Sequence, residues 1–312
     1  MNDQSGVLSA NPSDEEVLVI PDSWRRLLHP RRDGYRPRSV PKAEAGEWLA
    51  AEELAEITAR LSAATAAPQY AEPARAYLDG DAYPLGAAVV VTMADRWTRL
   101  RETKAVDGWV AEHGLAFAAC AFAESVALVC DYPDTVRPAR PQEIGYKWWE
   151  SEEPARRLRT LLAVADEREY QEVVARLADH RRTPVQRVVV SYLVPTRQDW
   201  VAECLANEDH SPAWMLLCVL NAPHQLDPLV EKLSSLDLVM PSLGVMATLV
   251  ERVGTAATPL LVALLEMWHL YGDFCRTVLD VLAMLPGDEA FQALVDRAGQ
   301  DRTGPALREA AR

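Results

Sequence analysis

The stretch RTPVQRVVVSYLVPTRQDWVAECLAN, residues 182–207, holds the pattern that decides the fold. Pro184 follows a threonine and opens a mostly apolar run, which is typical of a helix that begins with a capping hydroxyl and a proline in its first turn. After a short break, QDWVAECLAN has the apolar spacing of a second helix. The stretch therefore predicts a pair of short helices.

This pattern recurs along the second half of the chain. Helix-start signals contain Pro154, Pro184, Pro212 and Pro241, so the steps between them are 30, 28 and 29 residues. Further units begin near Tyr271-Gly272 and near Thr303. Helix pairs repeated at a short, constant period predict an α-solenoid, in which each unit packs on its neighbours. The alternative is an irregular helical bundle.

The predicted fold class is therefore all-α, and the predicted domains are three. Residues 1–16 read as a disordered tail, 17–150 as an N-terminal helical domain, and 151–312 as about five repeats, the last incomplete. Within the N-terminal domain, 107–129 predicts one long buried helix. Residues 131–147 contain three prolines and predict an extended connector.

Composition limits the classes of function. The net charge of −14 argues against general binding to nucleic acid and to anionic membranes. The five cysteines form no CxxC pair and lie mostly in apolar runs, as expected of reduced thiols in the core. The polar, acidic N-terminus predicts no signal peptide. We expect a cytoplasmic protein without a metal or other cofactor.

The repeating units resemble HEAT-like repeats in their period and helix order. Two segments, PDSWRRLLHPRRDG and VVARLADHRRTPVQRVVVSYLVPTRQDW, also resemble the N-terminal region of large actinobacterial MolR-like proteins. That second resemblance implies helical repeats before a C-terminal domain, and a scaffold or regulatory role. It implies no established chemistry.

The basic stretch WRRLLHPRRDGYRPR, residues 24–38, is the main candidate site and is called the strap below. It carries about +5, against about −19 for the rest of the chain, by counting charged side chains. Arginines near so many carboxylates favour docking on the protein's own body. The alternative is an exposed arm that binds a ligand. The candidate partner-binding residues here are Arg25, Arg26, Arg31, Arg32, Arg36 and Arg38.

Other candidates lie in and before the repeats. Arg181, Arg182, Arg197 and Trp200 could form a binding edge, and Trp148-Trp149 could be an aromatic anchor or a staple between domains. Glu124 stands alone in an apolar run, as a catalytic acid or as the partner of Arg96 or Arg99. Asp179-His180 and Asp209-His210 could hold a metal, although histidines in a last helical turn also complement the helix dipole.

No catalytic motif appears, and the sequence favours a non-enzymatic scaffold that binds a basic protein or peptide. Its binding surface would be concave and made by the second helix of each pair. One alternative is a nucleic-acid-associated, repair-like HEAT protein that uses the arginine clusters. Another is an accessory subunit or N-terminal part of a larger enzyme.

Overall fold

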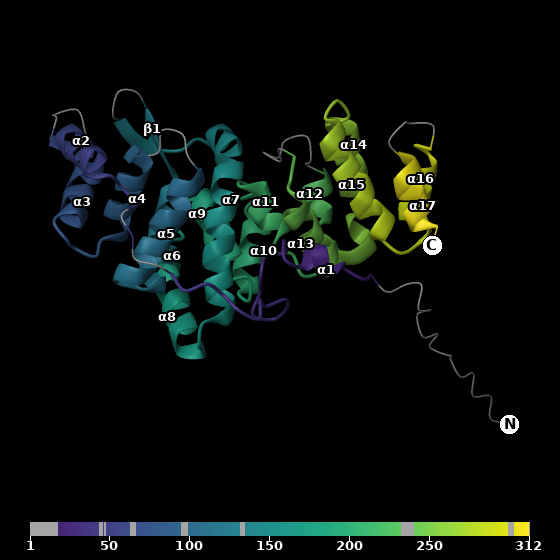
Figure 1. The fold of residues 1–312 in the computed structure, drawn as a ribbon, viewed down its shortest axis with the longest axis horizontal. Helices are drawn as coiled ribbons and strands as arrows, with labels where there is room; N and C mark the ends of the chain where they lie inside the picture. The colour runs from purple at the N-terminus through teal and green to yellow at the C-terminus, as the bar shows by residue number, and fades with distance from the viewer. Residues whose placement is uncertain are drawn as a thin grey trace.

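The computed structural model describes residues 18–43, 46, 48–62, 67–94, 99–131, 135–231, 240–298 and 303–311. The predicted all-α class is confirmed, with one small β-hairpin added. The molecule is elongated, with α2, α3 and α4 at one end and α16 and α17 at the other (Figure 1). The predicted tail, 1–16, lies outside the described residues.

The N-terminal helices are α2 (Ala51–Ser62), α3 (Pro68–Leu78), α4 (Pro84–Ala94), α5 (Arg99–His113) and α6 (Leu115–Val126). The prediction of one helix over 107–129 is wrong. Gly114 has a φ of 87°, which glycine adopts at little cost, and the chain turns there between α5 and α6. Helix α6 is buried from Leu115 to Glu124, as its small apolar residues allow.

The predicted extended connector is instead a hairpin followed by a long helix. Strand β1 (Leu128–Asp131) pairs antiparallel with β2 (Thr135–Pro138), with Leu128 opposite Pro138. Arg137 donates to both Asp131 and Glu143, which ties β2 to the first turn of α7 (Pro141–Val164). The predicted boundary at 150/151 falls inside α7, and Pro154 lies within that helix rather than at its start.

The second half contains the helix pairs that the repeat pattern predicts. The first members are α7, α9 (Pro184–Leu193), α11 (Ala213–Leu217), α13 (Leu243–Val253), α15 (Gly272–Met284) and α17 (Thr303–Ala310). The second members are α8 (Glu167–Ala178), α10 (Gln198–Ala206), α12 (Asp227–Glu231), α14 (Thr258–Met267) and α16 (Asp288–Val295). Short 3-10 turns, η2 (Pro223–Gln225) and η4 (Gly254–Ala257), precede α12 and α14.

Capping side chains start several of these helices, and the sequence predicts the one at the start of α9. Thr183 accepts a hydrogen bond from the Gln186 N–H at 3.2 Å, and Ser242 accepts one from the Val245 N–H at 3.2 Å. Pro184 is in the first turn of α9, whereas Pro212 is the residue before α11. These signals fix where the helices begin, because they satisfy backbone donors that have no partner within the helix.

The first helices form a row in which α7 contacts α9, α9 contacts α11, and so on through α13, α15 and α17. One apolar core runs along this row and also includes residues of α4, α5 and α6. A smaller core lies between α2, α3, α4 and the hairpin. The N-terminal helices α4, α5 and α6 therefore share the main core of the row.

One helical stretch of the described chain, Leu243–Met267, is long and apolar enough to cross a membrane, with a mean hydropathy of 1.4. It consists of α13, η4 and α14, and Gly254 breaks it with a φ of 57°. Its apolar side chains, including Met246, Leu249 and Leu261, belong to the core. Packing inside the protein explains the apolar character of this stretch.

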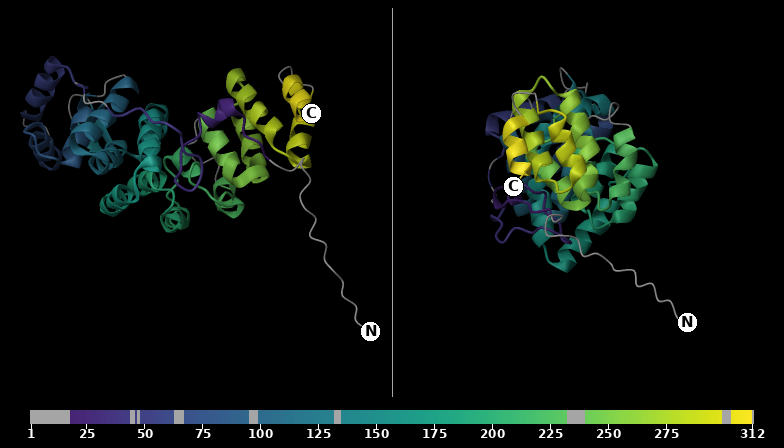
Figure 2. Two further views of the ribbon diagram at one scale, coloured as in Figure 1. Left: turned by 60° about the horizontal axis from the view of Figure 1, so that its bottom comes forward. Right: turned by 90° about the vertical axis from the view of Figure 1, so that its right-hand side faces the viewer.

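The strap crosses the row of helices rather than extending from it (Figures 1 and 2, purple). It begins at α1 (Asp22–Arg25), which contacts α13. A Cβ added at Gly244 of α13 would lie 2.5 Å from the carbonyl oxygen of Leu27. The strap backbone therefore approaches α13 as closely as a glycine allows.

We predict that Gly244→Ala destabilises the protein, although alanine is the better helix former by about 1 kcal/mol. The new methyl group would force the backbone of Leu27 away, and overpacking of this kind costs about 1–3 kcal/mol. Urea denaturation at neutral pH measures the change. Gly304→Ala in α17 is the matched control, because its nearest neighbour would be the mobile end of Arg308 at 3.8 Å. Equal stability of the two variants would contradict the prediction.

Candidate functional site

His29 of the strap is enclosed by four of the first helices. Its backbone N–H donates to Thr248 Oγ1 of α13 at 2.9 Å, and its Nδ1 lies 2.6 Å from the Tyr192 hydroxyl of α9. Its Nε2 is 3.5 Å from Glu152 of α7, and its ring is 5.7 Å from that of Trp214 of α11. Four helices of the row therefore contact His29. The residues of α7 to α13 that contact the strap, among them Glu152, Tyr192, Trp214 and Thr248, are called the strap face below.

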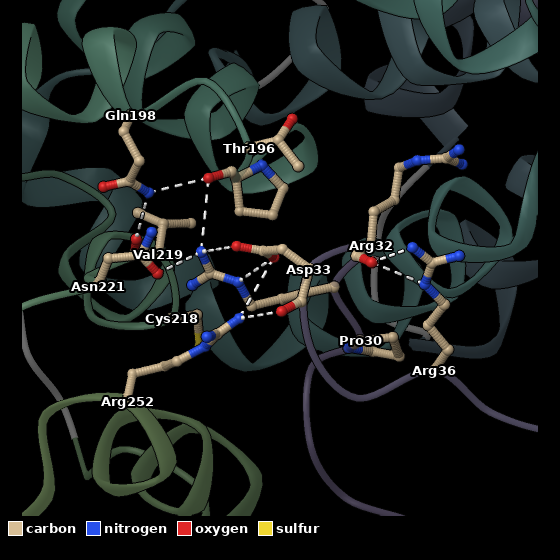
Figure 3. A network of polar contacts seen from close by, with 12 residues as sticks. Pro30, Arg32, Asp33, Arg36, Thr196, Gln198, Cys218, Val219, Asn221 and Arg252 are labelled. Atoms are coloured by element: carbon tan, nitrogen blue, oxygen red, sulfur yellow. Dashed lines mark hydrogen bonds and ion pairs between the residues drawn. The ribbon is translucent and has the colours of Figure 1, made fainter. Parts of the chain in front are cut away.

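Arg31 is the most deeply engaged of the strap arginines, with 1% of its surface exposed. Its Nη2 donates to Asn221 Oδ1 at 2.6 Å and to the Pro195 carbonyl at 3.5 Å, and its Nη1 donates to the Leu220 carbonyl at 3.4 Å. These acceptors lie in the loops that follow α9 and α11. Figure 3 shows Asn221 and Gln198 on one side of the site and Asp33 and Arg252 on the other.

Asp33 closes the site from the strap itself. Its carboxylate accepts from Arg31 Nε at 3.1 Å and lies 3.3 Å from Arg252 Nη2 of α13. A backbone bond from the Arg31 N–H to the Tyr35 carbonyl folds the strap into a turn here. Burial alone would raise the pKa of Asp33, but Arg31 and Arg252 outweigh it and hold the pKa below its usual value. The carboxylate is therefore charged and balances two guanidinium groups.

Arg32 points in the opposite direction, to the end of α7. Its Nη1 donates to the carbonyls of Leu162 and Ala165 at 3.3 and 2.5 Å, and its Nη2 donates to Glu167 at 2.8 Å. Its guanidinium also lies 4.4 Å from the centre of the Tyr170 ring. Arg32 thus caps the C-terminus of α7, where the carbonyls have no partner within the helix and the helix dipole is negative.

Arg159 of α7 completes the strap face from the other side. It is buried, and it donates to the Pro30 carbonyl at 2.7 Å and to the Cys218 carbonyl at 3.0 Å. Its guanidinium lies 4.6 Å from the centre of the Tyr192 ring. One arginine therefore joins α7, α11 and the strap backbone.

The remaining strap arginines are exposed. Arg25 donates to the Ile20 carbonyl at 3.2 Å, and Arg36 donates to the Arg32 carbonyl at 2.8 Å (Figure 3). Arg26 and Arg38 are also exposed. Arg31 and Arg32 are thus used by the fold, as the docked interpretation of the strap predicts, while these four lie at the surface.

The predicted edge around Trp200 is brought together in part. The guanidinium groups of Arg181 and Arg197 lie 4.4 and 4.1 Å from the centre of the Trp200 ring. Arg181 also pairs with Glu203 at 2.7 Å, and Arg197 pairs with Asp199 at 2.6 Å. Both cations are therefore balanced by carboxylates of α10.

Arg182 lies elsewhere and contacts Glu124 of α6, a carboxylate that is 4% exposed. Glu124 also accepts from Gln186 at 2.7 Å and lies 2.5 Å from Nδ1 of His180. These partners are on α9 and in the loop before it, because α6 packs against α8 and α9. The expected partners, Arg96 and the side chain of Arg99, lie outside the described residues. This cluster joins the N-terminal helices to the row and leaves Glu124 no open side for a substrate.

The histidine-aspartate pairs do not form a metal site. His180 binds Glu124, while Asp209 accepts two hydrogen bonds from Arg187 at 2.5 and 3.1 Å. No group of three or more metal-ligating side chains occurs within the described part of the chain. Trp148 and Trp149 fall in α7, but their side chains lie outside the described residues.

Comparison with known proteins gives one family. The family model described as the YehI second domain matches residues 43–236, well over half of the chain. The match begins just after the strap and includes α2 to α12. Searches of curated proteins and of solved structures find no match.

We predict that acid destabilises the protein through His29. Burial lowers the pKa of His29 from 6.5 to about 4, opposed in part by Glu152 and assisted by Arg159. The folded protein then binds fewer protons than the unfolded chain between these values, so stability is full above pH 6.5 and falls toward pH 4. The loss amounts to about 3 kcal/mol, since one pKa unit corresponds to about 1.4 kcal/mol.

Urea denaturation of wild type and His29→Gln at several pH values tests this. Glutamine keeps a polar side chain but does not titrate, so the variant should lose less stability than wild type between pH 6.5 and 4.5. Parallel pH profiles for the two proteins would show that His29 is not responsible.

Glu124→Ala should destabilise the protein by about 1–3 kcal/mol. The substitution leaves Gln186 and His180 without their shared acceptor, whereas Arg182, 57% exposed, can turn to water. Asp199→Ala is the control, because an exposed ion pair contributes at most about 1 kcal/mol. Thermal and urea denaturation compare the two variants, and a larger loss for Asp199→Ala would refute the role given to Glu124.

Proposed function

The chain belongs to the family of the YehI second domain, and from this premise we propose that it is a non-enzymatic protein-binding module. The description of the family as a second domain supports a module that works beside other domains. It also suits the alternative that the chain is an accessory subunit or N-terminal part of a larger enzyme.

We further propose that the row of helices is a HEAT-like solenoid. Support comes from the first helices, each of which contacts the next from α7 to α17, and from the second helices α10, α14 and α16, which pack against them. A likeness to MolR-like proteins in particular is part of the same proposal and rests on the two sequence segments that suggested it. In a solenoid of this kind, successive units present a long surface for binding.

The observation that carries the function is that the two sides of the row differ. The first helices hold the strap, an extended segment, so one side already binds a peptide in cis. The second helices expose carboxylates, among them Glu172 of α8, Glu231 of α12 and Glu289 of α16. Together with the net charge of −14, this acidic side suits a basic protein or peptide.

Neither the arginines nor the acidic surface favours the nucleic-acid alternative. Arg181, Arg182, Arg187 and Arg197 each form an ion pair with a carboxylate of this chain. Phosphate binding would have to break these pairs and overcome the net negative charge. A cytoplasmic location is part of the proposal, supported by five cysteines that are all free thiols.

We predict that reversing the acidic surface abolishes binding. The triple variant Glu172→Lys, Glu231→Lys, Glu289→Lys should capture its basic partners from the native host at least about tenfold less than wild type, because charge complementarity is lost. Quantitative mass spectrometry of affinity-purified complexes measures the difference.

Arg168→Glu on α8 is the matched control, since Arg168 is exposed beside the same surface and its reversal adds negative charge. It should keep or increase capture. The proposal fails if the triple variant and wild type retain the same proteins. A gel shift with DNA or RNA at physiological salt would instead support the nucleic-acid alternative.

A further inference from the structure

We propose that the strap face is a recognition site for an extended, arginine-bearing segment of a partner, and that the strap is its exchangeable occupant in cis. This inference rests on the proposed binding function and adds the chemistry of one ligand. It concerns the strap face, which lies on the first helices and reaches Glu167 and Tyr170 of α8 through Arg32. The exposed carboxylates of Glu172, Glu231 and Glu289 are not part of it.

The strap face recognises main-chain groups that any extended segment carries. Thr248 Oγ1 accepts from the backbone N–H of residue 29, and Arg159 donates to the carbonyl of residue 30. Arg156 donates to the carbonyl of residue 26 at 3.1 Å, and Arg157 donates to that of residue 41 at 2.8 Å. The donors and acceptors therefore follow a chain of about sixteen residues, as extended peptide recognition requires.

One side chain gives this recognition its specificity. The Arg31 guanidinium meets Asn221 Oδ1 and two carbonyls that lie in different directions. A planar fork of five donors can reach all of them at once, whereas a lysine ammonium group is a compact point with three. Asn221 is itself held in place, because its backbone N–H donates to Gln225 at 2.6 Å.

The strap also resembles a bound ligand in its connectivity. Its hydrogen bonds to the body join residues 129 to 219 positions apart in the sequence. The strap face is therefore built by α7 to α13 alone, and the strap contributes no residue to those helices. Leu28, His29 and Arg31 are buried, so the strap is a tight occupant that must be released before another can enter.

Exchange can be tested on the complete, folded protein. A protease recognition sequence is inserted after Lys42, which is exposed, and the purified protein is cleaved so that the strap fragment stays bound only by non-covalent contacts. A fluorescent synthetic peptide of residues 18–40 is then added, and its binding is followed by anisotropy. We expect the peptide to replace the fragment, while size-exclusion chromatography and circular dichroism show a body that is still folded.

Peptide variants test the chemistry of recognition. Arg31→Lys in the peptide should bind at least about tenfold more weakly, because the fork of donors is lost. Arg36→Ala should bind like wild type, since Arg36 is exposed and its guanidinium donates to a carbonyl of the strap itself, that of Arg32. Asn221→Ala in the body should weaken the wild-type peptide and reduce the preference for arginine over lysine at position 31.

Three results would overturn the proposal: no exchange while the body stays folded, unfolding of the body when the fragment leaves, or equal binding of the Arg31→Lys peptide. The last would show that position 31 is not recognised as arginine. The triple variant of the acidic surface should leave exchange unchanged. Failure of exchange and failure of partner capture are therefore separate outcomes, and each tests one surface.

Discussion

The fold depends on how the carbonyl groups at the ends of the first helices are satisfied. The last carbonyls of any α-helix lack partners within it, and the strap side of the row collects such groups from α7 and from the loops after α9 and α11. Arg32, Arg31 and Arg159 supply the donors. Because these donors are cationic, they also complement the negative ends of the helix dipoles. An arginine-rich segment in an acidic protein is thus explained by what it contacts.

Contacts between residues far apart in the sequence also join the two halves of the chain. Glu124 in α6 meets partners near the start of α9, Arg157 in α7 meets Asp107 in α5, and a shared core continues across α7. Helix α7 belongs to both halves, since its first turn is held by Arg137 and its last by Arg32. Among the described residues, the helices before and after α7 therefore contribute to one apolar core.

Local signals predicted much of this architecture, and long-range contacts were beyond them. Thr183-Pro184 predicted the start of α9, because a capping hydroxyl acts on its own first turn. Gly114 alone does not predict a break, since a single glycine is tolerated within a helical pattern. The charge of the strap predicted that it docks on the acidic body. Charge could not predict the groups that accept its hydrogen bonds, because Asn221 and the backbone carbonyls are uncharged. Two residues carried a usable signal in the sequence. Arg159 is an arginine among apolar positions of α7, which indicates a buried hydrogen-bonding role, and Gly244 is a glycine within a helix, which indicates a close backbone neighbour.

The position of the strap in the sequence has a consequence for how the protein is made. The strap leaves the ribosome before the helices that it contacts, since its partners Thr248 and Arg252 come more than two hundred residues later. Such distant pairing is slow to form, because a long loop must close before any contact is gained. The helices from α7 to α13 must therefore assemble first, and the strap docks onto them late. During synthesis the nascent chain therefore carries a basic segment whose binding face has not yet been made.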